Sequence, residues 1–231
     1  MSRTEPIRND WAVVLWRRDA GECDRRAVLL TEHHGKLPVR FGGVNRPAGK
    51  LKALSEPMVW AEYRLHFSVR SQSVRVIGGR IQSSFPGLRA DLSRTLAALS
   101  ACEMAMRLCA ERVPTPAKYR LLARALCVLD QGESPWLETA FGLKLLDYAG
   151  YSLKELPVPP AERELWRALH EAPLEGLSGL PWRPDAGRRF LQVVYDHVEA
   201  NAQCALRSRD AAAGLERFAL SLQCPKELVP C

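Results

Sequence analysis

The clearest hydrophobic pattern in the chain is a strict alternation over residues 59–69. Apolar or small side chains recur at every second position, while Trp60, Glu62 and Arg64 begin the opposite, polar face. Alternation of this length is typical of a strand that has one face in a core and the other in water. It predicts a half-buried strand.

Shorter apolar or alternating runs surround this strand in the first third of the chain. They cover residues 11–16, 28–31, 36–41 and 74–81, and turn-forming residues separate them. Five short strands so close together suit a small barrel, and the five-stranded OB-fold is the economical choice. The first part of the chain is therefore predicted to be an OB-fold.

The hydrophobic period changes from two to about 3.6 at Phe85-Pro86-Gly87, which predicts that the remainder is helical. Helical spacing is predicted over 88–109, 116–129, 135–150, 160–171 and 185–204, with a last helix from Ser208 to Leu222. The predicted fold class is α+β, with an OB-fold domain at 1–82 and an all-helical domain at 83–231.

Composition narrows the class of protein. The 231 residues are 47% hydrophobic, which is ample for a buried core, and no apolar run is long enough to cross a bilayer. Charges interrupt the N-terminus before Trp11, so we expect no signal peptide and a cytoplasmic chain. The seven cysteines are scattered and form no C-x-x-C pair, as expected for reduced thiols and not for a zinc knuckle.

Positive charge is concentrated in one segment. Residues 36–80 carry nine Lys or Arg against Glu56 and Glu62, and this net +7 equals the charge of the whole chain. A strand-rich surface with so local a charge is a candidate for binding a polyanion such as nucleic acid, although a solvated basic face is the alternative. The predicted phosphate contacts are Lys36, Arg40, Arg46, Lys50, Lys52, Arg64, Arg70, Arg75 and Arg80.

Trp60 lies on the same polar face as Arg64, which leaves two interpretations of this ring. Proteins that bind single strands combine a cationic groove with rings on which bases stack, so Trp60 is a candidate stacking platform. It is equally suited to being covered by the helical part.

Catalytic signals are missing from the sequence. None of the phosphate-loop, nucleophile-elbow, zinc-protease or dinucleotide-binding motifs occurs, and the adjacent His33 and His34 are best interpreted as structural or surface residues. A metal-dependent nuclease needs clustered acids near its basic face, where only Glu56 and Glu62 are present. We therefore expect no enzymatic activity and no cofactor.

Short segments along residues 9–217 together carry a family resemblance. They include Trp11–Leu15, Leu30–Lys36, Gly42–Pro47, Phe85–Leu88, Phe141–Tyr151 and Leu206–Arg209. In order and spacing these segments resemble the RecO family of bacterial recombination mediators.

The resemblance implies an OB-fold followed by a helical domain, and a role in recombinational DNA repair. Such proteins bind single- and double-stranded DNA and anneal complementary strands coated by the single-stranded-DNA-binding protein, SSB. They act with RecR to load the recombinase RecA, in the bacterial cytoplasm at the nucleoid, and they are not enzymes.

Two departures from the family pattern matter. Many members carry a cysteine zinc site after the Gly-Tyr step, whereas residues 152–157 contain no cysteine, so we predict no metal. Some members dock the acidic, apolar tail of SSB on basic residues near the third helix, where this chain has Thr139 and Ala140. The remaining candidates for partner binding are Lys118, Arg120, Arg124 and Lys144.

The main prediction is thus a DNA-binding mediator that anneals strands. The alternative is a protein–protein adaptor whose helical domain is the main binding surface and whose contact with DNA is incidental. Affinity for DNA at physiological salt distinguishes the two.

Overall fold

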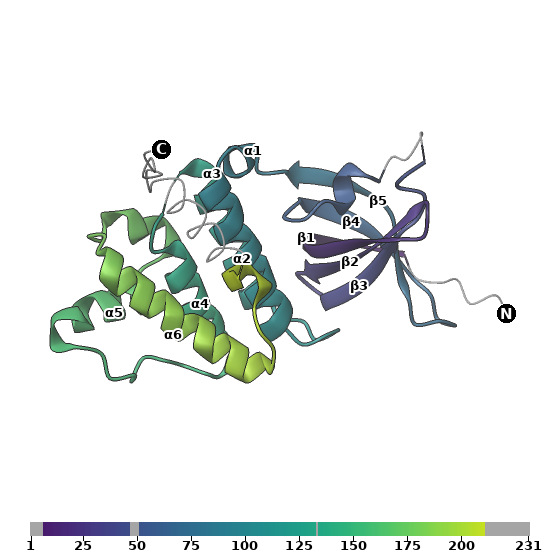
Figure 1. Ribbon diagram of the computed structural model, residues 1–231. Helices are drawn as coiled ribbons and strands as arrows, with labels where there is room; N and C mark the ends of the chain where they lie inside the picture. Colours follow the sequence, from purple (N-terminus) through teal and green to yellow (C-terminus); the bar gives the residue numbers. More distant parts are fainter. Residues whose placement is uncertain (1–6, 47–50, 133, 211–231) are drawn as a thin grey trace, which may run out of the picture.

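The fold consists of a closed β-barrel beside a bundle of helices (Figure 1). The computed structural model describes residues 7–46, 51–132 and 134–210. Five strands come first and the helices follow, which confirms the predicted α+β class and the OB-fold.

The barrel closes in the strand order β1-β2-β3-β5-β4. β3 and β5 are parallel, the other neighbours are antiparallel, and β1 pairs with β4 to complete the ring. The strands are β1 (Ile7–Ala20), β2 (Asp24–Thr31), β3 (Gly35–Phe41), β4 (Trp60–Phe67) and β5 (Val74–Ser83), and the short 3-10 helix η1 (Ala53–Ser55) precedes β4.

The barrel interior is filled by the apolar positions that alternate along the strands. On β4, Ala61, Tyr63 and Leu65 are fully buried inside. Tyr63 packs edge-on against Phe41 of β3, and its hydroxyl donates a hydrogen bond of 2.8 Å to the carbonyl of Leu54. A buried polar group must be paired, so this bond links the core to η1.

Among the described residues, the helical part contains α1 to α6, two 3-10 turns and the beginning of a last helix. No helix in the described part of the chain is long and apolar enough to span a bilayer. The elements are α1 (Pro86–Arg89), α2 (Leu92–Leu108), α3 (Pro116–Gln131), α4 (Leu137–Ala149), η2 (Pro160–Glu162), α5 (Arg163–Glu171), η3 (Leu174–Gly179) and α6 (Pro184–Ala202).

Two predicted helices differ in detail from the structure. The run expected over residues 88–109 is split, because the side chain of Asp91 accepts a bond of 2.8 Å from the backbone N–H of Arg94 and starts α2 anew. The last predicted helix begins at Arg207, where Glu103 accepts its backbone N–H and that of Ser208. Its residues 211–222 lie outside the described part.

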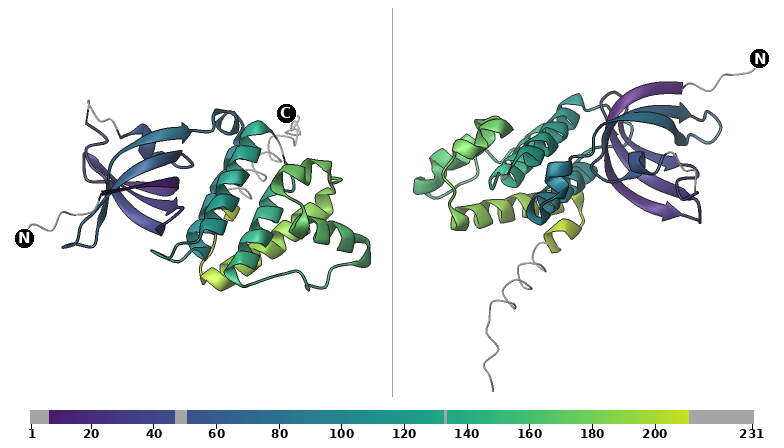
Figure 2. Two further views of the ribbon diagram at one scale, coloured as in Figure 1. Left: turned by 180° about the vertical axis from the view of Figure 1, so that it is seen from behind. Right: turned by 90° about the horizontal axis from the view of Figure 1, so that it is seen from above.

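One outer face of the barrel is buried against α2 and α3 (Figure 2). Val13, Leu15 and Leu30 point away from the barrel interior and are buried in the same apolar cluster as the helices. The apolar run at residues 11–16 therefore serves two cores, which explains why it shows no alternation.

The connection between α2 and α3 fits closely against the start of β3. The backbone N–H of Arg112 donates a 3.0 Å bond to the carbonyl of Lys36. Gly35 has a φ of +71°, and a Cβ there would lie only 2.1 Å from the carbonyl oxygen of Val113. Gly35 is required both by its backbone conformation and by this contact.

Replacing Gly35 by Ala should destabilise the protein more than replacing Gly21 by Ala. Gly21 has a similar φ of +70°, but nothing lies within 4 Å of its missing Cβ. Gly21→Ala should therefore lower the free energy of unfolding by about 1 kcal/mol for its backbone conformation alone. Gly35→Ala should lower it by a further 1–3 kcal/mol, roughly the cost of an overpacked contact. Urea denaturation measures both, and equal losses would contradict the close docking.

Candidate nucleic-acid interface

Four arginines lie side by side across four strands of the barrel. Arg18 of β1 is opposite Arg26 of β2, Arg26 is opposite Arg40 of β3, and Arg40 is opposite Arg75 of β5. Opposed residues in neighbouring strands project on the same face. All four residues are exposed, and we call them the arginine row.

The arginine row lies along a surface groove of about 500 Å³. Arg112, from the connection between α2 and α3, lines the groove as well. Its guanidinium donates a hydrogen bond to the carbonyl of Gln72 in the loop between β4 and β5. The helical part thus adds a fifth cation to a groove that the barrel provides.

Acidic side chains offset only part of this charge. Asp24 accepts bonds from the Arg40 Nε at 2.7 Å and from the Gly43 backbone N–H at 2.8 Å. The Gly43 N–H and then Arg40 hold the pKa of Asp24 below its usual value, so the carboxylate is ionised at neutral pH. Like charges directly opposite each other destabilise a sheet, and a polyanion would relieve that repulsion.

The position of the row is the one that OB-folds use for oligonucleotides. These folds bind such ligands on the face of their second and third strands, flanked by the β1–β2 and β4–β5 loops. Arg26 and Arg40 occupy the second and third strands here. With strands about 4.8 Å apart, the four arginines extend over roughly 15 Å, which suits a stretch of phosphate backbone.

The structure disperses the other predicted cations. Arg46 is exposed close to Asp24, and Arg70 is exposed in the loop between β4 and β5. Arg64 lies on the outer face of β4 and Arg80 on that of β5. The guanidinium Nη2 of Arg80 is 3.7 Å from the carboxylate Oε2 of Glu62. Lys52 is exposed before η1, and Lys50 lies outside the described residues.

Lys36 is not on the exposed basic surface that the sequence predicted. It is half-buried, and its ammonium donates a 2.7 Å bond to the carbonyl of Met106 on α2. Burial lowers the pKa of Lys36. The side chain therefore ties β3 to α2.

Trp60 is covered by the helical part, the second of the two interpretations. Its indole N–H donates a 2.9 Å bond to the hydroxyl of Tyr119 on α3, and its ring lies 5.9 Å from that of Trp11. We do not assign base stacking to this ring.

The predicted partner-binding residues fall in different environments. Lys118 is buried and donates a 2.9 Å bond to the carbonyl of Leu108, so its ammonium is not available to a partner. Arg120 is exposed and pairs with Glu32 at 3.2 Å, and Arg124 is also exposed. Lys144 is half-buried and donates to the carbonyl of His170.

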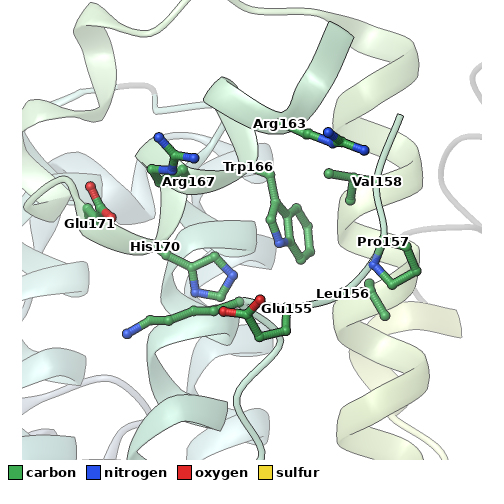
Figure 3. A pocket seen from close by; sticks show the side chains of 10 residues that line it. Glu155, Leu156, Pro157, Val158, Arg163, Trp166, Arg167, His170 and Glu171 are labelled. Atoms are coloured by element: carbon green, nitrogen blue, oxygen red, sulfur yellow. The ribbon is translucent and has the colours of Figure 1, made fainter. Parts of the chain in front are cut away.

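A second candidate site is a pocket of about 420 Å³ between α5 and the segment that precedes η2 (Figure 3). Trp166 and His170 lie at its centre, and Leu156 and Val158 form the facing wall. Three cations and two acids complete the lining, namely Lys154, Arg163, Arg167, Glu155 and Glu171.

His170 is neutral in this pocket at physiological pH. Burial lowers the pKa of its ring, and Asp147, whose Oδ2 lies 3.5 Å from Nδ1, opposes this shift only in part. With His170 uncharged, the pocket lining still has a net positive charge, because one lysine and two arginines outnumber its two glutamates.

Sequence reasoning missed Arg18, Arg26 and Arg112 as members of the cationic groove. Arg18 and Arg26 lie in a segment whose basic and acidic residues balance, so its net charge gave no signal. The alignment of the two strands against each other and against β3 would have revealed them. That register depends on contacts between distant residues.

The two adjacent histidines share one buried carboxylate. His33 Nδ1 lies 2.8 Å from Asp10 Oδ1, His34 Nδ1 lies 2.6 Å from Asp10 Oδ2, and the Asp10 side chain is fully buried. Among the residues that the structure describes, no group of three or more His, Cys, Asp or Glu side chains is placed to hold a metal. The pair has a structural role at the turn between β2 and β3.

His33 should titrate above its ordinary value of about 6.5. The bond to Asp10 raises the pKa of His33, and Glu32 adds a smaller contribution, while desolvation and, less strongly, Arg120 oppose the shift. This bond stabilises the fold fully below pH 6.5, and the contribution is lost as the pH rises through the raised pKa. NMR titration should show the shift, and His33→Ala should cost more stability at pH 6 than at pH 9. A His33 pKa at or below 6.5 would contradict this.

Comparisons with known proteins agree with this architecture. The family model described as recombination protein O N terminal matches residues 6–85, and the one described as recombination protein O C terminal matches residues 89–155. The two matches follow each other, the first over the barrel and the second over the first helices. The pocket of Figure 3 lies mostly beyond them.

Several similar proteins are named DNA repair protein RecO. The DNA repair protein RecO of Myxococcus xanthus is 35% identical over 144 residues, which are 62% of this chain and 58% of that protein. RecO of Desulfitobacterium hafniense is 29% identical over 61% of this chain and 50% of its own length. RecO of Bacillus subtilis is 28% identical over 53% and 48%. The matches thus span about half the length of these relatives.

Proposed function

Because the chain belongs to the RecO family, whose relatives named above are DNA repair proteins, we propose that it binds DNA through the arginine row and anneals complementary strands. The observation that carries the proposal is the register of β1, β2, β3 and β5. It places four exposed arginines in one line, on the face that OB-folds use for oligonucleotides.

The proposed mechanism requires no covalent chemistry. Two complementary strands repel each other through their phosphates, and each arginine that contacts a phosphate neutralises one charge and releases its counterions. A groove holding five cations lowers that repulsion until base pairing takes over. Arg112 lies on the helical side, so a strand bound there contacts both parts of the molecule.

We also propose that the protein acts with RecR and SSB to load RecA, as the family resemblance implies. The support for a protein partner is the pocket of Figure 3, which combines apolar walls with a cationic rim. Acidic peptides that carry apolar side chains are complementary to such a surface. The exposed Arg120 and Arg124 on α3 are the competing location.

Removing Arg26 and Arg75 should weaken DNA binding in a salt-dependent way. For single strands, log K falls with log salt at a slope of about −0.7 per neutralised phosphate, so the double Ala variant should flatten the slope by about 1.4. Fluorescence anisotropy of a labelled oligonucleotide across a salt series measures this. The matched control is Arg183→Ala with Arg188→Ala, which removes the same charge from exposed positions at the start of α6.

The same variants separate DNA binding from annealing. The Arg26 and Arg75 variant should anneal complementary strands more slowly than the control, with a thermal unfolding midpoint no lower than that of the wild type, because its loss of like charges relieves repulsion in the sheet. Annealing at the wild-type rate would overturn the assignment of this face. Weak wild-type binding with little salt dependence would favour the adaptor.

Reversing two charges of the pocket should locate the partner site. Arg163→Glu with Arg167→Glu should weaken binding of a peptide matching the acidic C-terminus of the cognate SSB by about tenfold, from the loss and reversal of exposed charge contacts. The matched variant is Arg120→Glu with Arg124→Glu, because both pairs lie four residues apart on a helix. A larger loss in the α3 variant would move the site there.

A further inference from the structure

We infer that Trp16, together with the crevice between the barrel and α2, seats bases of a single strand and makes the site prefer single strands over duplex. This inference rests on the proposed DNA binding by the arginine row. In the proposed function the arginine row contacts only phosphates. Trp16 and the crevice would provide the contacts to the bases.

A β-bulge in β1 directs the Trp16 side chain away from the barrel interior. Val14 of β1 pairs with Leu29 and Trp16 pairs with Val28, so Leu15 between them has no partner in β2. Ala12 and Val14 face the barrel interior, and strict alternation would place Trp16 there as well. The extra residue shifts the alternation by one position, and a bulge is a common device for redirecting a side chain.

The outward position brings Trp16 beside the arginine row. The indole is partly exposed and lines the cationic groove, and the guanidinium carbon of Arg18 lies 5.8 Å from its ring centroid. A cation over an aromatic face is attracted to it, so Arg18 also orients the ring. The cationic groove therefore contains an accessible aromatic ring.

Trp16 also lines the crevice between the barrel and α2, which is a second, mainly apolar groove with a volume of about 500 Å³. Leu96, Leu99 and Met106 of α2 form its far wall, and Val28 lies beside Trp16 on the barrel side. Trp16 and Val28 belong to both grooves, so the two grooves meet at these residues. α2 passes next to the barrel in the views of Figures 1 and 2.

The chemistry of the joined grooves fits a single-stranded nucleic acid. Phosphates on the arginine row leave the bases free to turn toward Trp16 and the apolar wall, and every base has a face that can stack. Arg107 lies at the rim of the apolar groove, where it pairs with Glu103 at 3.4 Å. A duplex keeps its bases paired and stacked inside, so it can use the row but not the crevice.

The test compares Trp16→Ala with Trp16→Phe on one sequence, as a single strand and as a duplex. Trp16→Ala should weaken single-strand binding by about 5- to 100-fold, as expected when a stacked base loses its ring. Duplex affinity and the salt slope should change little, because no phosphate contact is lost. Trp16→Phe should retain most of the single-strand affinity.

Leu99→Gln provides an independent variant, because Leu99 is 36% exposed on α2 and outside the barrel core. It should also weaken the single strand selectively. An equal loss of affinity for the single strand and the duplex, or no loss of affinity in either variant, would overturn the proposed base binding by Trp16 and the crevice. Neither result would contradict phosphate binding by the arginine row. Wild-type protein that binds neither form in a salt-dependent way would overturn the proposed function itself.

Discussion

The structure depends on the burial of one outer face of the barrel beneath α2 and α3. β1 takes part in two cores, because Ala12 and Val14 fill the barrel while Val13 and Leu15 pack against the helices. Each fully buried valine or leucine side chain contributes about 1.5–3 kcal/mol relative to exposure in water. Polar bonds add specificity at the same interface, from Lys36 to α2 and from Trp60 to α3. Separating the two parts would expose all of these groups at once.

This docking also determines which surface is available to a ligand. Once α2 and α3 cover one side of β1 and β2, the exposed arginines lie beyond the covered area, on strands that continue around the barrel. The helices form the border of that surface, since Arg112 reaches the β4–β5 loop and α2 lines the adjoining crevice. The proposed interface is thus a product of the packing of the two parts.

Much of the fold could be predicted because strand and helix periods are local properties of the sequence. The alternation around Tyr63 marked a barrel strand, and the charge count marked a segment that includes Arg40 and Arg75. Long-range contacts explain the failures. In the sequence Lys118 cannot be told from a surface lysine. In the structure its ammonium donates to a carbonyl at the C-terminal end of α2. The sequence places both Trp16 and Trp60 next to basic residues but makes Trp60 the stronger candidate, because neither the docking of α3 nor the bulge at Leu15 has a local signature.

The bond between Arg112 and the carbonyl of Gln72 links a loop of the barrel to the connection between two helices. An isolated barrel would therefore lack one of its groove cations and the apolar wall of its crevice, and it would present Val13, Leu15 and Leu30 to water. An exposed apolar patch of this kind promotes aggregation. Dissecting the chain into a DNA-binding fragment and a partner-binding fragment would change both surfaces, so the smallest meaningful unit for binding studies includes the barrel and the helices that cover it.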